Sequence, residues 1–264
     1  MPELIREDCK DMLAELVRKE DICFTDTWES AIILALKFAH DKGFSTVLVP
    51  DQGGIVPSQD LLERLDMTAI IFPTKHGLFL GSIMKHYDRV VLFANSMPSF
   101  AVLADFYGLN YWCQQNNIFL INDVSGSIGT KQATYGNVAV CNFEKAPLQS
   151  GGAMIAANSF KDFFRMNFKK AALVEEDELY ANLMKLPLLR ERLLSISRII
   201  KKDLVRFDII HRYGDGWNVL IETTDEKEKE TLIKYCEQHK HRYLLCPTRE
   251  RMLRPGISIE LIEA

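Results

Sequence analysis

Short, wholly apolar runs alternate with amphipathic stretches along the first 157 residues. Residues 3–19 carry apolar side chains at helical spacing, and residues 30–40 are apolar enough for a buried helix that Asp26 or Thr27 could cap. Further apolar runs, separated by turn residues or helix-like segments, lie at 46–50, 70–73 with its flanks, 89–95, 118–123, 138–143 and 151–157. Such continuous runs predict strands buried on both faces of a mostly parallel sheet.

The pattern changes near residue 158. A helical stretch rich in Lys, Glu, Leu and Met continues to about residue 207, and its predicted apolar face consists of Leu186, Leu188, Leu189, Leu193, Leu194 and Ile196. The remaining sequence predicts strand, strand, helix, strand and strand at 206–213, 217–224, 225–240, 242–247 and 256–261. We therefore expect an α/β protein: a large domain over 1–157 with a mostly parallel sheet between helices, then a long connecting helix and a small α+β domain over 158–264.

Composition narrows the function classes. With 47% hydrophobic residues in 264, the chain can bury a full core. The net charge of −4 gives no basic footprint for nucleic acid or a membrane surface, so a small-molecule partner is favoured. The six cysteines form no C-x-x-C pair and no histidine lies at ligand spacing beside them, so we expect no metal site. The charged N-terminus and the lack of a long apolar run predict a cytoplasmic protein.

Polar residues follow three of the predicted strands at the point where each ends. Asn95 ends the run at 89–95, Asp123 ends the run at 118–123, and Lys145 follows the run at 138–143. Ligands of open parallel sheets bind at the carboxyl ends of the strands, so these side chains are expected to share one mouth. An acid, an amide and an amine in one partly desolvated site suit an aldehyde cofactor with a ring nitrogen, because a lysine forms the Schiff base and the acid keeps the ring nitrogen protonated.

Each of these residues also has a structural interpretation. Asp123 could be a helix N-cap, and Asn95 could shape the turn before Pro98. Lys145 could be solvated with its stem on apolar surface, as most lysines are. It is the order of the three residues along the chain that favours a site.

The segment INDVSGSIGT at 121–130, with Asp123 as the acid that ends a strand before small residues, resembles the fold-type-I enzymes that use pyridoxal 5′-phosphate (PLP). Lys145, placed after a short strand and before Gly151 and Gly152, is similar to their cofactor lysine, and Asn95 in NSMP is similar to their cofactor-facing asparagine. The similarity is greatest to the DegT-like sugar aminotransferase branch, in a short and divergent form.

The resemblance implies a PLP-dependent aminotransferase acting on a small-molecule amino donor and a keto acceptor, built as a homodimer. Lys145 would form the Schiff base and move the proton, and Asp123 would stabilise the pyridinium nitrogen. The implied cofactor-binding residues are Asn95, Asn142, Thr27, Trp28 and Ser125. Arg254, with Arg251 near it, falls where such enzymes often hold a substrate carboxylate.

A second hypothesis is a non-catalytic protein of the same fold, acting as a binding or scaffold subunit after losing the cofactor. Three features favour it: Trp28 replaces a small residue of the phosphate-binding turn, Glu29 would lie beside the anion, and Gln52 and Gly53 stand where an aromatic ring normally stacks on the cofactor. A third hypothesis uses Lys145 as an amine nucleophile on a carbonyl substrate without PLP.

Overall fold

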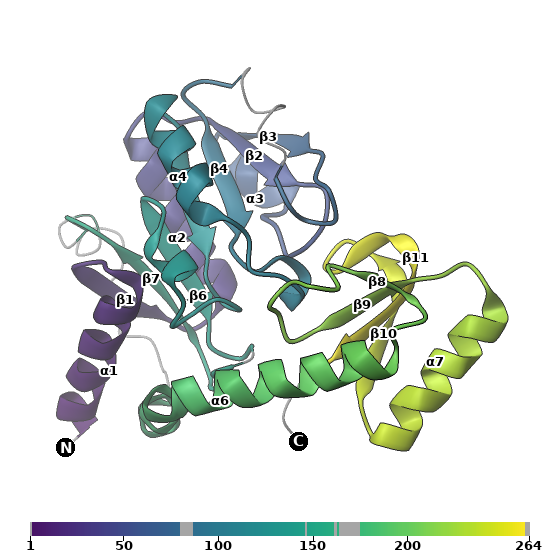
Figure 1. Cartoon of the computed structure of the whole chain (residues 1–264). Helices are drawn as coiled ribbons and strands as arrows, with labels where there is room; N and C mark the ends of the chain where they lie inside the picture. Colours follow the sequence, from purple (N-terminus) through teal and green to yellow (C-terminus); the bar gives the residue numbers. More distant parts are fainter. Residues whose placement is uncertain (1, 80–86, 146, 161–162, 164–174, 262–264) are drawn as a thin grey trace.

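A seven-stranded sheet with the order β1-β7-β6-β5-β4-β2-β3 forms the larger part of the molecule (Figure 1). The computed structural model describes residues 2–79, 87–145, 147–160, 163 and 175–261. The strands are β1 Asp21–Thr25, β2 Thr46–Pro50, β3 Thr68–Phe72, β4 Val91–Asn95, β5 Phe119–Asp123, β6 Val138–Asn142 and β7 Ala153–Ala157. Strands β2 to β6 are parallel to one another, and β7 pairs antiparallel with both β6 and β1. The expected mostly parallel sheet is confirmed.

Helices cover both faces of this sheet, as the two-sided burial of its strands requires. Helix α2 (Trp28–Asp41) packs on the face that carries Phe93 and Ile121, together with α3 (Gln59–Arg64). Helix α4 (Phe106–Gln115) packs on the opposite face, against Leu92 and Leu120. Helix α1 (Pro2–Val17) packs on that same face nearer its β1 edge. The large unit is thus a three-layer α/β structure.

A second, antiparallel sheet of four strands lies beside the first, in the order β10-β11-β9-β8. Its strands are β8 Asp208–Ile210, β9 Val219–Glu222, β10 Arg242–Thr248 and β11 Met252–Glu260, and α7 (Glu226–His239) covers it. Helix α6 (Glu176–Asp203) runs below both sheets in Figure 1. It contributes Leu183 and Leu186 to the core of the large sheet, and Ile200 and Leu204 extend the core of the small one.

The structure corrects two sequence expectations. Strand β1 was not predicted, because its five residues begin with an acid and follow a helix without a turn residue between them. In the structure the Asp21 carboxylate accepts the backbone N–H of Phe160 at 2.7 Å. Leu188, expected on the apolar face of α6, is 74% exposed. The predicted start of the long helix near residue 158 falls partly on residues outside the described part, and the described helix begins at Glu176.

All six cysteines are buried and unpaired. Among the described residues, His, Cys, Asp and Glu side chains form no cluster of three or more that could hold a metal ion. No helix in the described part of the chain is long and apolar enough to cross a membrane.

Candidate functional site

The carboxyl ends of β4, β5 and β6 bring the predicted polar residues to one edge of the large sheet. Asn95, Asp123 and Asn142 are the last residues of these strands, and Asn95 pairs directly with Asp123 in the parallel register. Lys145 lies in the turn after β6, where its backbone N–H donates to the carbonyl of Asn142 at 3.4 Å. The structure places these four residues in the lining of one cavity, including Asn95, Asp123 and Lys145, which were expected to share a mouth.

Two more of the predicted residues line this cavity, and two do not. Trp28, the first residue of α2, and Ser125, just after β5, are both buried in its wall. Thr27 is exposed and serves as the N-cap of α2, its hydroxyl accepting the N–H of Ser30 at 3.1 Å. Arg254 lies outside the lining and forms an exposed ion pair with Glu222 at 2.9 Å.

The Asp123 carboxylate already has hydrogen-bond donors from the protein itself. Its Oδ1 accepts the backbone N–H of Ser125 at 3.0 Å and also the Ser125 hydroxyl. The Trp28 side chain, at the start of α2, lines the same cavity and acts on this carboxylate in the direction of a lower pKa. The indole N–H is the only polar group of Trp28 and is a donor, so it is the part of the side chain that favours the charged acid. Asp123 is thereby held by Ser125 and faced by Trp28.

The two asparagines are likewise engaged by nearby backbone. Oδ1 of Asn95 accepts the N–H of Met97 at 2.7 Å, and Oδ1 of Asn142 accepts the N–H of Glu144 at 3.0 Å. A backbone N–H requires an oxygen acceptor, so the amide NH2 of each side chain lies on its other side. Both asparagines therefore keep donor groups available at the cavity edge.

Burial raises the pKa of Asp123, whereas the hydrogen bonds from Ser125 and Trp28 and the nearby charge of Lys145 act in the opposite direction. A carboxyl whose pKa is higher in the folded than in the unfolded chain binds its proton more tightly when folded. Its contribution to stability therefore falls as pH rises from the ordinary Asp value of about 3.9 to the raised one.

This linkage predicts that the unfolding free energy of the wild type, minus that of Asp123→Asn, decreases as pH rises through that window. The asparagine cannot titrate, so the difference isolates the contribution of this carboxyl. Urea unfolding at a series of pH values measures it, with Asp41→Asn at the exposed end of α2 as the control. A difference that stays constant or increases with pH would contradict the raised pKa.

The small sheet contributes part of the cavity wall. The turn between β10 and β11 contributes Glu250 and Arg251 to the lining. Two hydrogen bonds join the backbone of this turn to the large unit. The Gly53 N–H donates to the carbonyl of Arg249 at 2.9 Å, and the Ser99 hydroxyl donates to the carbonyl of Arg251 at 2.6 Å. The cavity is therefore enclosed between the strand ends and the small sheet.

Arg251 is held in place by a buried ion pair. Its Nε and Nη2 donate to the two carboxylate oxygens of Glu260 at 2.7 and 2.6 Å, and its guanidinium lies 5.5 Å from the ring centroid of Phe100. Both partners of the pair are at least nine-tenths buried. The guanidinium is thus committed to Glu260.

Four lining residues were missed by the sequence analysis: Gly54, Ile55, Phe100 and Glu250. The glycine pair of VPDQGG carried a usable signal, because a Cβ at Gly54 would come within 3.3 Å of the Asn95 amide nitrogen. The other three reach the cavity through tertiary packing that no local pattern indicates.

Comparison with known proteins finds a shared fold and little shared sequence. DndA from Streptomyces lividans aligns with a TM-score of 0.74 at 10% identity, over 97% of this chain and 87% of that one. 3-Amino-5-hydroxybenzoic acid synthase aligns with a TM-score of 0.72 at 12% identity, over 97% and 84%. Alanine–glyoxylate aminotransferase from Nostoc sp. aligns with a TM-score of 0.71 at 11% identity, over 98% and 82%.

The chain has the fold of the fold-type-I PLP-dependent enzymes. The expected resemblance is confirmed at the level of fold, in a divergent form. No protein-family model matches the sequence, and no curated protein matches it.

The cavity lined by the residues expected to hold PLP is almost filled by the protein's own side chains. Its volume is about 20 Å³. A single water needs roughly 10–15 Å³, whereas pockets for small molecules and cofactors measure roughly 300–1,000 Å³. The buried Trp28 indole stands in the wall of this cavity and faces Asp123, the acid that the family resemblance assigns to a cofactor ring nitrogen. The residues in this arrangement do not fit PLP.

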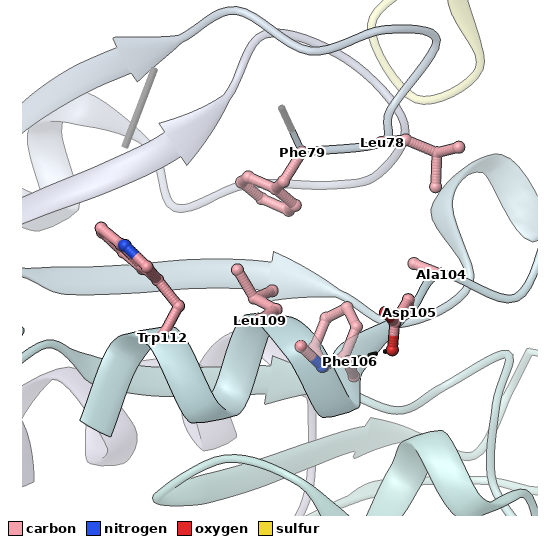
Figure 2. Close-up of a pocket in the computed structure, with 8 residues that line it drawn as sticks. Leu78, Phe79, Ala104, Asp105, Phe106, Leu109 and Trp112 are labelled. Carbon is pink, nitrogen blue, oxygen red and sulfur yellow. Dashed lines mark hydrogen bonds between the residues drawn. The ribbon is translucent and has the colours of Figure 1, made fainter. Parts of the chain in front are cut away.

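A larger cavity of about 450 Å³ lies elsewhere, over α4. Figure 2 shows Phe106, Leu109 and Trp112 projecting from α4 toward Leu78 and Phe79. The one ionisable residue in the described part of the lining, Asp105, caps α4 by accepting the N–H of Gly108 at 3.2 Å. The described lining is mainly apolar and brings no catalytic pair together.

Proposed function

We propose that this protein is a non-catalytic member of the PLP-transferase fold, acting as a binding or scaffold subunit. The observation that carries the proposal is the buried Trp28 indole beside Asp123 in a cavity of only about 20 Å³. By the family resemblance Asp123 would hold a cofactor's ring nitrogen, and here it faces an indole. The group beside the acid is thus a side chain of the protein itself.

The closed surroundings support the same proposal. Arg251, which could otherwise receive a substrate carboxylate, is neutralised by Glu260 inside the protein. The Gly53 N–H and the Ser99 hydroxyl donate to carbonyls of the β10–β11 turn and hold this turn against the cavity. An incoming cofactor would have to displace a packed indole and separate these contacts, and no free cation in the described lining other than Lys145 offers compensation.

A PLP-dependent aminotransferase is the second candidate. The observation that favours it is the convergence of Lys145, Asp123, Asn95 and Asn142 on one cavity, in the order that the family resemblance implies. In this candidate Trp28 must leave the cavity, and the cofactor would supply an electron sink there. An amino donor, a keto acceptor, a homodimer and a cytoplasmic location remain predictions that belong to it.

Visible absorption with saturating PLP separates the two candidates. We expect no absorption band above that of free cofactor, because the occupied cavity leaves no place for the ring. After borohydride reduction, peptide mass analysis should find pyridoxyl groups scattered over exposed lysines, equally in wild type and in Lys145→Ala. A band that borohydride bleaches, with the adduct on Lys145 alone, would support the enzyme and refute the non-catalytic proposal.

A further inference from the structure

A polar pocket of about 390 Å³ opens at the other end of the large sheet, far from the Asp123 cavity along the strands. It lies where β5 begins, at Phe119, and where β6 is about to begin, at Gly136 and Asn137. Asn158, just after the antiparallel β7, reaches the same edge. Its volume lies within the roughly 300–1,000 Å³ typical of small-molecule sites.

Three asparagines in this pocket have fixed amide orientations. The Oδ1 atoms of Asn110, Asn137 and Asn158 accept backbone N–H groups at 3.0, 2.8 and 3.1 Å, from Gly136, Leu120 and Glu20 respectively. A backbone N–H can be met only by the amide oxygen, so the orientation of each amide follows from its neighbour. Among the described residues none of the three NH2 groups has a hydrogen-bond partner. These three amides therefore have donor groups left over, and Gln114 and the Tyr135 hydroxyl add lining groups that can both donate and accept.

Two lysines add positive charge to these donors. Lys19 is 8% exposed, and its ammonium has one long hydrogen bond, 3.4 Å to the carbonyl of Thr134. Burial lowers the pKa of Lys19, which indicates that its charge lacks adequate compensation. Lys42 lies with its ammonium 4.6 Å from the ring centroid of Phe38.

No carboxylate belongs to the described lining of this pocket. The acids nearest in sequence are Glu20 and Asp41, both exposed, and Asp21, whose carboxylate binds the backbone N–H of Phe160 at 2.7 Å. A pocket with two ammonium groups, several amide donors and no carboxylate in its described lining favours a ligand rich in acceptors. An anion meets this better than a neutral polyol, because it also offsets the charge of the two lysines.

We propose that this pocket binds a small phosphorylated molecule, with its phosphoryl group between Lys19, Lys42 and the amide of Asn137. A phosphoryl group carries about −1.5 to −2 charge and three strong acceptor oxygens, enough to engage two ammonium groups and an amide together. The remaining volume, beside Tyr135, holds the rest of the molecule. This proposal does not depend on whether the Asp123 cavity binds a cofactor, because the two sites lie at opposite ends of the strands.

The test is isothermal titration of the full-length protein with inorganic pyrophosphate, inorganic phosphate and citrate. Asn137→Asp is the most informative variant, because its carboxylate still accepts the Leu120 N–H while it replaces a donor with a negative charge. We expect pyrophosphate to bind the wild type and Asn137→Asp to lose that binding. Lys42→Gln should weaken it roughly tenfold or more, as expected for a hydrogen bond to a charged group.

Lys37→Gln is the matched control, since Lys37 is an exposed lysine of α2 outside the pocket. It should leave the affinity for pyrophosphate within about twofold of wild type, because the charge of an exposed lysine outside the pocket is largely screened by salt. Thermal unfolding of each variant confirms that the fold is kept. The proposal is overturned if neither pyrophosphate nor phosphate binds, or if citrate binds more tightly than both. It is also overturned if Asn137→Asp keeps the wild-type affinity for pyrophosphate or Lys37→Gln loses it.

Discussion

Replacing Trp28 by alanine is expected to lower the unfolding free energy by about 3–5 kcal/mol, the usual cost of removing a buried aromatic side chain. The indole is 6% exposed and packs edge-on against Phe93, with centroids 6.1 Å apart and an interplanar angle of 84°. Its removal also takes away the polar N–H that faces Asp123. Urea unfolding of the two proteins measures the loss.

Adding free indole should recover part of that stability, because a cavity of matching shape and polarity would be open to it. Indene has nearly the same shape and lacks the N–H, so it should raise the melting temperature of Trp28→Ala less than indole does. Trp28→Phe is the companion variant, since it keeps most of the volume and loses only the donor. If indole and indene stabilise equally, an interaction between the N–H and Asp123 does not define the site.

Arg251→Met is the second change with a large expected effect, about 3–5 kcal/mol, because it leaves the Glu260 carboxylate buried without its counter-charge. Glu260 would retain only the Ser258 hydroxyl and the Asn218 amide, which donates at 3.0 Å. Thermal and urea unfolding both report the change. The double variant Arg251→Met/Glu260→Leu should recover a substantial part of the lost stability, because neither charge then remains buried.

Arg254→Met is the matched control for Arg251→Met. Its partner Glu222 accepts at 2.9 Å, but the Arg254 side chain is 64% exposed, so breaking this pair should cost no more than about 1 kcal/mol. Equal losses of unfolding free energy in Arg251→Met and Arg254→Met would show that burial of the Arg251–Glu260 pair does not increase the cost of breaking it. A double variant less stable than Arg251→Met would contradict the expected cost of an unpaired buried Glu260.

Sequence pattern was sufficient for the parallel sheet and for the convergence of Asn95, Asp123 and Lys145. Strands buried on both faces need continuous apolar runs, and parallel strands end at a common edge, so both features follow from local sequence. These three residues line one cavity as expected.

The contents of that cavity could not be predicted in the same way. Trp28 was recognised as too large for its position, yet only the fold brings α2 to the end of β5 and the indole to Asp123. Similarly, Arg251 and Arg254 are three residues apart, and the sequence does not say which side chain turns inward. Their different exposure depends on the pairing of β11 with its neighbours and on the position of Glu260.

Helix α6 has a consequence for how the molecule unfolds. Its first half completes the core of the large sheet and its second half completes the core of the small one, through Leu186 and Ile200 among others. An isolated helix of about half this length is only marginally stable in water, so each half of α6 depends on the core it packs against. Loss of either core therefore destabilises the helix and, through it, the other core. The two sheets should therefore melt together in one cooperative transition, and neither is a module that can be cut away and studied alone.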